Sequence, residues 1–335
     1  MKKIGLFAVL IAVGLIVPGV MTVADEKTGV ENIDYRGEMR KFVELISARS
    51  KSRVAGFYVI GQNALPLVTI NGKHDGRLAT GYVKAIDGVG IEELFYGHER
   101  AGVRSSEKIT RYMLPYLERF RKTGKTVMVV DYVASLTQAE DSHRLSSEKG
   151  FISFQGQPQL STIPPWKFDI SMGSVTSLDD AENFLYLLNP SGFRNRESYL
   201  NALRETNHDI LLVDAFFWGS PLTSSEVSAL KKKRSGERRL VLSYMSIGEA
   251  EDYRYYWKDS WKKTPPPFLE RENLRWRGNY KVRYWMDQWQ RVICGSEDGS
   301  GFESSYLGRV MNAGFDGVYL DILDAAFYFE KKYPR

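Results

Sequence analysis

Short apolar runs rich in β-branched and aromatic residues recur along the chain, and most of them end in a polar residue. Nearly continuous apolar runs are what a parallel sheet requires when helices bury both of its faces. Eight runs fit this description: residues 57–63, 94–97, 127–133, 151–155, 184–189, 210–214, 240–246 and 317–321. The sequence therefore predicts eight parallel strands.

The intervals between these runs show helical spacing. In the first interval, positions i, i+3, i+4 and i+7 hold apolar residues, namely Met39, Phe42, Val43 and Ile46. In a later interval, Thr223 followed by Glu226 forms a capping box, which marks the start of a helix. Alternation of strands and helices eight times over predicts an α/β fold, a (β/α)8 TIM barrel, and does not fit a sandwich or a helical bundle.

The pattern also predicts how the chain is organised. We expect a signal segment over residues 1–24, a polar leader over 25–35 and a single barrel over 36–335. The barrel divides into halves at about 36–155 and 183–330, joined by a proline-containing linker over 156–182. An aromatic and basic insertion over 250–305 is expected to lie above the barrel face at the carboxyl ends of the strands.

The N-terminus has the three parts of a secretory signal. Lys2 and Lys3 form a short basic region, an apolar stretch follows over residues 4–20, and Thr22-Val23-Ala24 supplies small residues for cleavage. The alternative is an uncleaved membrane anchor, because the apolar stretch is nearly long enough to span a bilayer. In either case we expect an extracellular or cell-surface location.

Composition removes several classes of protein. The 335 residues are 43% hydrophobic and 26% charged, which is ordinary for a globular protein. A net charge of +5, from 46 basic and 41 acidic residues, is too balanced for a nucleic-acid partner. The single cysteine, Cys294, excludes a disulfide framework, and the four histidines lack metal-binding spacing. We expect a monomer without nucleic acid or metal, attached to a membrane only through an uncleaved N-terminus.

In a (β/α)8 barrel the functional residues lie at the carboxyl ends of the strands. Carboxylates, amides and aromatic rings dominate these positions, a mixture suited to binding sugar hydroxyls and stacking on sugar rings. The expected substrate-binding residues are Gln62, Asn63, Tyr96, Asp131, Tyr132, Tyr244, Glu251, Tyr319 and Asp324. Asp131 could equally be an ion-paired structural group, and five tryptophans of the insertion could be sugar platforms or simply its core: Trp257, Trp261, Trp276, Trp285 and Trp289.

Three carboxylates are the expected catalytic groups. Asp214 ends one strand, Glu249 follows the next, and Asp321 ends the last. Glycoside hydrolysis uses two such groups, one as general acid and the other as base or nucleophile. Their separation distinguishes the two stereochemical outcomes, at about 5–5.5 Å for retention and roughly 6.5–9.5 Å for inversion.

Three stretches resemble glycoside-hydrolase family 114: LVLSYMSIGEAEDYRYYW at 240–257, GNYKVRYW at 278–285 and AGFDGVYLDILDA at 313–325. The branch that they resemble is the extracellular TIM-barrel one related to endo-α-1,4-polygalactosaminidases. The resemblance implies a (β/α)8 fold and hydrolysis of a galactosamine-containing polysaccharide without metal or organic cofactor. It covers most of residues 36–330.

The order of the resembling segments is changed. In this branch the segment similar to residues 183–328 comes first, and the segments similar to 40–63, 88–97 and 125–133 follow it, whereas here they precede it. The sequence therefore resembles a circular permutation of the family barrel. First and last strands of a barrel are neighbours, so the old termini can be joined and a loop opened.

The resemblance also implies roles for individual residues. Asp214 matches the strand-end aspartate proposed as catalytic in the family, and Asp321 and Asp324 match the aspartates of a later motif. The departure is Tyr319, because active enzymes of the wider family carry there a glutamate proposed as general acid. Tyrosine, with an ordinary pKa near 10, does not easily replace a carboxylic acid.

This departure leaves the acid role and the function open. Glu249, Glu251 or Asp321 would take the acid role, or the protein does something else. The other classes are a non-catalytic polysaccharide-binding barrel at the cell surface and a surface-anchored structural barrel whose rim residues only cap turns.

Overall fold

The structure is a computed structural model that describes residues 33–334. The predicted signal segment 1–24 and most of the predicted leader 25–35 lie outside the described residues. Helix α1 (Tyr35–Lys51) begins at the last residue of that leader.

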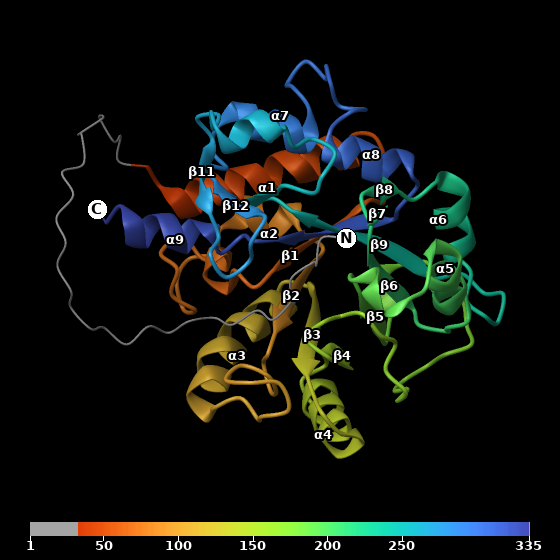
Figure 1. Ribbon diagram of the computed structural model, residues 1–335. Coiled ribbons are helices and arrows are strands. Elements are labelled where there is room, and N and C mark those ends of the chain that lie inside the picture. Colours follow the sequence, from red (N-terminus) through yellow and green to blue (C-terminus); the bar gives the residue numbers. More distant parts are fainter. Residues whose placement is uncertain (1–32, 335) are drawn as a thin grey trace.

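Eight parallel strands form a nearly closed barrel with helices around it (Figure 1). The sheet order is β4-β3-β2-β1-β13-β9-β6-β5. The strands are β1 (Tyr58–Gln62), β2 (Gly88–Glu92), β3 (Thr126–Tyr132), β4 (Ile152–Gly156), β5 (Phe184–Leu187), β6 (Ile210–Asp214), β9 (Leu240–Ser246) and β13 (Gly317–Asp321). The predicted TIM-barrel fold is confirmed, and seven of the eight predicted runs overlap these strands.

The first and last strands of the chain are neighbours, since β1 pairs in parallel with β13. The sheet instead ends at β4 and β5, which face each other without a backbone ladder and meet through the rings of Phe154 and Phe184, 6.0 Å apart. The linker 156–182 connects these two edge strands along the chain. The seam of the barrel and the predicted junction of the two halves therefore coincide, while the permutation itself stays a prediction.

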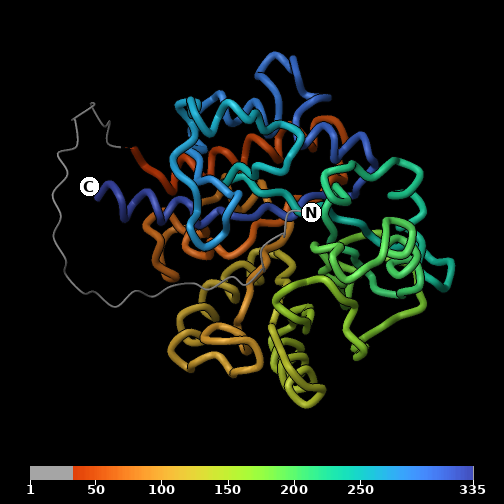
Figure 2. The backbone as a smooth tube through the Cα atoms, viewed as in Figure 1, coloured from red at the N-terminus to blue at the C-terminus, as the bar shows by residue number. Residues whose placement is uncertain are grey.

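Helices pack around the barrel: α2 (Thr80–Ala85), α3 (Glu107–Lys122), α4 (Leu136–Ser147), α5 (Arg196–Arg204), α6 (Ser224–Leu230), α7 (Asp287–Cys294), α8 (Tyr306–Asn312) and α9 (Ala325–Lys332). The predicted apolar face of α1 is buried, and the capping box at Thr223 and Glu226 begins α6. Helix α1 packs beside α9, with an ion pair between Arg36 and Glu330 at 2.8 Å (Figure 2). Among the described helices none has the length and apolar character to cross a membrane.

Shorter elements complete the fold. A hairpin of β7 (Phe216–Phe217) and β8 (Ser220–Pro221) follows β6, and β10 (Glu249–Glu251), β12 (Asn279–Val282) and β11 (Leu269–Glu272) form a small antiparallel sheet within the insertion. The 3-10 helices are η1 (Leu65–Val68), η2 (Leu178–Asp180), η3 (Pro190–Gly192) and η4 (Asp259–Lys262).

One predicted strand was misplaced. The sequence favoured residues 94–97, but the strand is β2, Gly88–Glu92. The two glycines of β2 are typical of a loop in sequence, yet packing requires them. A side chain at Gly90 would collide with the hydroxyl of Tyr319. A Cβ atom at Gly88 would lie 2.9 Å from the carbonyl oxygen of Thr126. A glycine inside a strand marks such a close approach.

A buried ion pair fixes the linker to the amino-terminal end of the barrel. Lys233 and Asp209 lie 2.6 Å apart with almost no exposed side-chain surface. The Lys233 ammonium also donates to the carbonyl oxygens of Ser171 and Gly173 in the linker, at 3.2 and 2.7 Å. The other Asp209 oxygen accepts from the side chain of Asn183, just before β5, at 3.0 Å. This pair therefore connects the linker, β5 and β6.

Replacing Asp209 by alanine is expected to lower the free energy of unfolding by about 3–5 kcal/mol, because the Lys233 ammonium would stay buried without its partner. Urea unfolding followed by circular dichroism measures this loss. Glu205→Ala is the control, since Glu205 pairs with Arg234 at the surface, and its loss should stay below about 1 kcal/mol. Equal effects of the two substitutions would contradict a role for the pair in holding the linker.

Candidate active site

The inward face of the barrel can be identified from Tyr319 on β13. Its ring lies 5.7 Å from that of Tyr186 on β5, and its hydroxyl fills the space above Gly90 on β2. Strands β5 and β2 are separated from β13 by two and one intervening strands respectively, so only a side chain inside the barrel reaches both. Tyr319 therefore points into the centre of the barrel.

The strand register then assigns the other inward positions, because paired residues of parallel strands share a face and side chains alternate along a strand. Tyr319 pairs with Tyr244, which pairs with Asp214. On the other side Tyr319 pairs with Ile60, and Gln62 two residues on pairs with Gly90. The resulting layer at the carboxyl ends of the strands, called the inward layer below, consists of Gln62, Glu92, Tyr132, Asp214, Tyr244 and Asp321.

Asp214 is held by an arginine from the insertion. Arg254 donates to both oxygens of Asp214 at 2.8 Å, and its Nε donates to Glu251 at 2.5 Å. The Glu251 carboxylate also accepts the hydroxyl of Tyr253 at 2.6 Å. A bidentate pair of this kind fixes the orientation of Asp214 and places a positive charge beside it. The side chain of Asp214 remains 16% exposed.

Asp321 lies in a different environment. Its Oδ2 accepts the hydroxyl of Tyr244 at 2.8 Å, and its Oδ1 accepts the backbone N–H of Ile322 at 2.7 Å. No cation pairs with it among the ion pairs of the described residues. Burial, assisted by the nearby charge of Glu92, raises the pKa of Asp321 well above its ordinary value. Asp321 is therefore a carboxyl that favours its protonated form.

Glu92, the last residue of β2, is the inward carboxyl that the sequence analysis missed. It accepts from the hydroxyl of Tyr132 and from the side-chain amide of Asn63, the latter at 2.9 Å. Burial raises its pKa, although these two hydrogen bonds oppose the shift. Placing the strand at 94–97 moved its expected end past Glu92, so the error in the strand hid this residue.

Glu249 and Asp324 lie at the rim, beneath the insertion. One Glu249 oxygen accepts from Asn273 at 2.9 Å and from Lys281 at 3.0 Å, both in the insertion. Its other oxygen is buried without a partner among the described residues. Burial raises the pKa of Asp324, and the charge of Lys281 opposes that shift. The insertion thus covers this side of the site, as the sequence predicted.

Two expected binding residues, Asp131 and Tyr96, make their side-chain contacts with helix α4 and not with the inward layer. Asp131 precedes Tyr132 and so points to the opposite face, where it accepts from the backbone of Phe95 and Tyr96 and from Ser142 at 2.7 Å. Burial raises the pKa of Asp131 to about 6. The hydroxyl of Tyr96 donates to Asp141 on α4 at 2.8 Å. These contacts connect strand ends to helices.

Backbone strain concentrates at the carboxyl ends of three adjacent strands. Asn63 after β1, Glu93 after β2 and Ile322 after β13 all have φ of 63°, a left-handed conformation that non-glycine residues seldom adopt. Strained residues persist where the surrounding structure holds them, and they cluster at functional sites. The backbone strain is therefore separate evidence that the candidate site lies at the carboxyl ends of the strands, where the inward layer is found.

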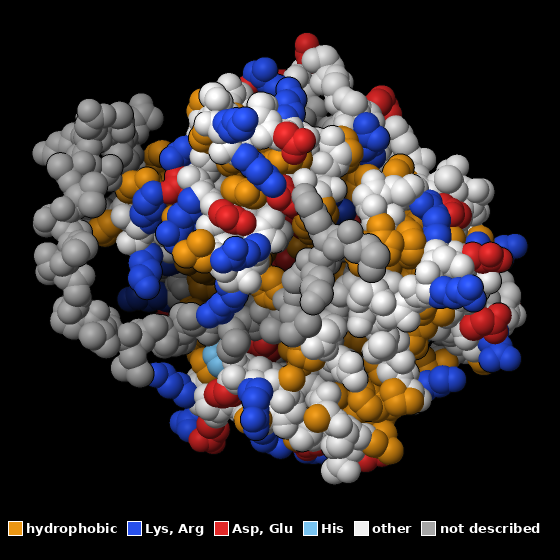
Figure 3. Space-filling model, viewed as in Figure 1, with side chains coloured by type: hydrophobic (Ala, Val, Ile, Leu, Met, Phe, Trp, Pro, Cys, Tyr) orange, Lys and Arg blue, Asp and Glu red, His pale blue; other side chains and the backbone are white. Residues whose placement is uncertain are grey.

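The tryptophans of the insertion mostly form its core. Trp289 is fully buried, and Trp257, Trp261 and Trp285 are partly buried and packed against the hydrophobic core. Two exposed aromatic residues beside Asp214 were not expected from the sequence: Trp218 is 48% exposed and Tyr253 is 42% exposed. On the face shown in Figure 3, basic and acidic side chains are interspersed.

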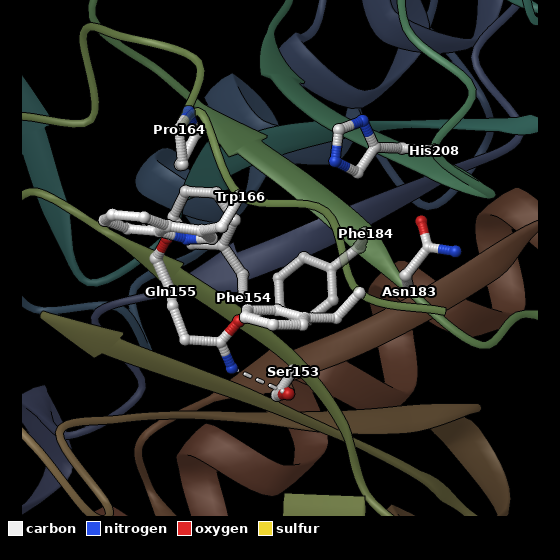
Figure 4. Close-up of a pocket in the computed structure, with 9 residues that line it drawn as sticks. Ser153, Phe154, Gln155, Pro164, Trp166, Asn183, Phe184 and His208 are labelled. Atoms are coloured by element: carbon white, nitrogen blue, oxygen red, sulfur yellow. Dashed lines mark hydrogen bonds between the residues drawn. The ribbon is translucent and has the colours of Figure 1, made fainter. Parts of the chain in front are cut away.

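A small pocket lies away from this site, at the seam between β4 and β5. Figure 4 shows Phe154, Gln155, Trp166 and Phe184 around it, with the Gln155 amide donating to Ser153 at 2.8 Å. The cavity volume is about 20 Å³, which suits one water molecule and not a sugar ring. Nowhere in residues 33–334 do three or more histidine, cysteine or acidic side chains gather as a metal site would require.

Glu93 offers a test of the buried charges at the rim. Burial, with the nearby charges of Glu92 and Asp131, raises its pKa to about 9. The folded state therefore binds a proton that the unfolded state releases, and stability falls as pH rises from about 4.5 towards 9.

Glu93→Gln should remove this dependence. Relative to wild type, we expect the variant to gain stability with rising pH, by up to about 1.4 kcal/mol per pH unit, between about pH 5 and 9. Urea unfolding at a series of pH values measures it, with the exposed Glu107→Gln as control. Parallel stability curves for wild type and Glu93→Gln would show that Glu93 ionises normally.

Comparison with known proteins identifies the same part of the chain. Residues 188–331, which contain Asp214, Glu249 and Asp321, match the model of glycoside-hydrolase family GH114. Uncharacterized proteins from Methanocaldococcus jannaschii, Thermotoga maritima and Deinococcus radiodurans are similar, at 33%, 41% and 35% identity over 47%, 27% and 38% of this chain. The matches span only 41%, 25% and 37% of those relatives. The family match over residues 188–331 and the nearly closed barrel of eight parallel strands together fit a GH114 TIM barrel.

Proposed function

We propose that this protein is a secreted glycoside hydrolase that cleaves a galactosamine-containing polysaccharide, with Asp321 as general acid and Asp214 as base or nucleophile. The observation that carries the proposal is the contrast between these two inward-facing carboxyls. One is paired with an arginine, and the other is buried without a cation. Carboxyls whose environments separate their protonation states are the pattern expected of an acid and a base in one site.

Asp321 suits the acid because it must be protonated before it can donate to the glycosidic oxygen. Its raised pKa and its place in the inward layer both favour this role. Glu249, the other candidate from the sequence, is paired with Lys281 and Asn273. These two contacts tie Glu249 to the insertion, so Glu249 is better suited to positioning the insertion than to contacting the scissile bond.

Asp214 suits the ionised role. Arg254 places its positive charge beside this carboxylate, and the Asp214 side chain remains partly exposed. Strand β9 lies between the strands of Asp214 and Asp321, so the two carboxyls stand on either side of Tyr244. A sugar ring bound above Tyr244 would contact both.

Tyr319 does not supply the missing acid. Its side chain is fully buried below Asp321, packed against Tyr186 and Gly90, and its pKa is raised well above the ordinary tyrosine value by burial. Its hydroxyl accordingly remains protonated and cannot alternate between acid and base. Its place in the structure is that of a plug below the inward layer.

The galactosamine-containing substrate and the extracellular location rest on sequence. The resemblance to endo-α-1,4-polygalactosaminidase-related proteins favours an amino sugar. The basic, apolar and small-residue pattern of residues 1–24 favours export.

One observation favours a second candidate, a polysaccharide-binding protein without turnover. Both Asp214 oxygens already accept hydrogen bonds from Arg254, which leaves less of the carboxylate free to act on a substrate. Measurement of reducing ends released from a polysaccharide panel, including partly deacetylated galactosaminoglycan, separates the two. Binding without release of reducing ends would favour the second candidate.

Asp321→Asn and Asp214→Asn are each expected to lower kcat on the cleaved polymer by about 10²–10⁴-fold, because each removes one partner of the acid–base pair. Tyr319→Phe is the matched control, since the Tyr319 hydroxyl has no hydrogen-bond partner in the described structure, and its kcat should stay near the wild-type value. Full activity of Asp321→Asn would exclude Asp321 as the acid.

The pH profile tests the environment of Asp321. The titratable groups around it are Glu92, Asp324, Tyr244, Tyr186 and Tyr319. The charge of Glu92 raises the pKa of Asp321, so Glu92→Gln should lower it. Because activity is lost as the acid ionises, the alkaline limb of kcat against pH should move to lower pH in this variant. An unmoved alkaline limb in Glu92→Gln would show that Glu92 does not act on the acid.

A further inference from the structure

We propose that Trp218 and Tyr253 form a stacking platform for a sugar ring of the polysaccharide, in a subsite beside Asp214. The choice of a polysaccharide as ligand rests on the proposed function, whereas the position of the platform follows from contacts that the proposed function does not use. Both side chains are exposed aromatics, at 48% and 42%, in a protein whose other large rings are mostly buried. Exposed aromatic faces beside polar side chains are surfaces on which sugar rings can stack through their C–H groups.

Trp218 is placed by the hairpin that begins directly after Asp214. The Asp214 Oδ1 atom accepts the backbone N–H of Phe216 at 2.9 Å, and this contact begins the β7–β8 hairpin directly after β6. Phe217 pairs with Ser220, so Trp218 and Gly219 are the two residues of the turn. Trp218 is therefore at the hairpin tip, four residues from Asp214.

The turn is an unfavourable place for tryptophan. Trp218 has φ of 49° and Gly219 has φ of 81°, as the two central residues of a type I′ turn require. Asn-Gly is the preferred sequence there, because asparagine tolerates positive φ and larger residues resist it. Strained residues cluster at functional sites, so a bulky, exposed tryptophan in this conformation suggests a functional role for its side chain.

The hairpin is fixed in place. Arg196 on α5 donates to the carbonyl oxygen of Pro221 at 2.6 Å and to the hydroxyl of Ser220 at 3.1 Å, while also pairing with Glu226 at 2.6 Å. The ring of Phe216 packs on Tyr306 of α8, with centroids 5.6 Å apart. The tip therefore stands on a supported hairpin and not on a free loop.

Tyr253 lies beside this tip. A Cβ atom placed on Gly219 would be 3.6 Å from the Tyr253 carbonyl oxygen. The Tyr253 hydroxyl donates to Glu251, and the Arg254 guanidinium lies 5.2 Å from the Tyr253 ring centroid. Arg254 in turn holds Asp214. The same network therefore positions the carboxylate and the tyrosine, which makes the platform continuous with the candidate active site.

The test separates binding from folding with Trp218→Asn. Asparagine suits the type I′ turn, so the variant should fold with an unchanged or higher Tm. We expect its binding to partly deacetylated galactosaminoglycan in affinity electrophoresis to be about tenfold weaker, the scale of one aromatic contact. Trp218→Tyr should restore part of the binding. Tyr112→Ala is the control, since Tyr112 is an equally exposed ring on α3.

Kinetics supply a second readout. If the ring only binds sugar, Trp218→Asn should raise KM on long polymers and leave kcat nearly unchanged. If Trp218→Asn binds the polymer as tightly as the wild-type protein, the platform is overturned. Release of reducing ends would in that case still support the hydrolase proposal. A wild-type protein that binds no polymer in the panel also overturns the platform. Binding that depends on Trp218 without any release of reducing ends supports the platform and overturns hydrolysis.

Discussion

The packing of Tyr319 across the barrel centre is the constraint on which the candidate site depends. Its ring contacts Tyr186, and its hydroxyl occupies the volume that a side chain at Gly90 would need. This plug separates the apolar lower part of the barrel from the polar inward layer above it. The carboxyls of Glu92 and Asp321 are buried in this inward layer, and burial raises the pKa of both.

The insertion brings positive charge to other carboxyls of the same rim. Arg254 and Lys281 bring positive charge from above to Asp214 and Glu249, while Asp321 and Glu92 receive mainly neutral hydrogen bonds from Tyr244, Tyr132 and Asn63. The result is a set of carboxyls on one barrel rim in different environments, two paired with cations and two buried without one. A carbohydrate-cleaving site needs this division, because like carboxyls in like environments would titrate together.

The buried Lys233–Asp209 pair and the candidate site lie at opposite ends of the barrel. At the amino-terminal end of the strands, the Lys233–Asp209 pair is fully satisfied and fixes the linker. At the carboxyl end, Asn63, Glu93 and Ile322 are strained, and Glu93 and Glu249 each keep a buried oxygen without a hydrogen-bond partner among the described residues. Such an asymmetry is typical of barrel enzymes, where the loops after the strands carry the chemistry and the other end supports the fold.

By itself the sequence determined the α/β barrel, the buried face of α1, the cap of α6 and the family segment that contains Asp214 and Asp321, because apolar spacing and contiguous motifs are local signals. Only the tertiary structure decided which strand-end residues face inward. Strands buried on both faces lack polar–apolar alternation, so Asp131 and Tyr132 cannot be told apart in sequence, although they point to opposite faces. The glycines of β2 hid Glu92, and the reason for one of them, Gly90, is Tyr319, which lies more than 200 residues away in the sequence. Likewise, the pairing of Arg254 with Asp214 and the exposure of Trp218 follow from chain segments that meet only in the folded barrel.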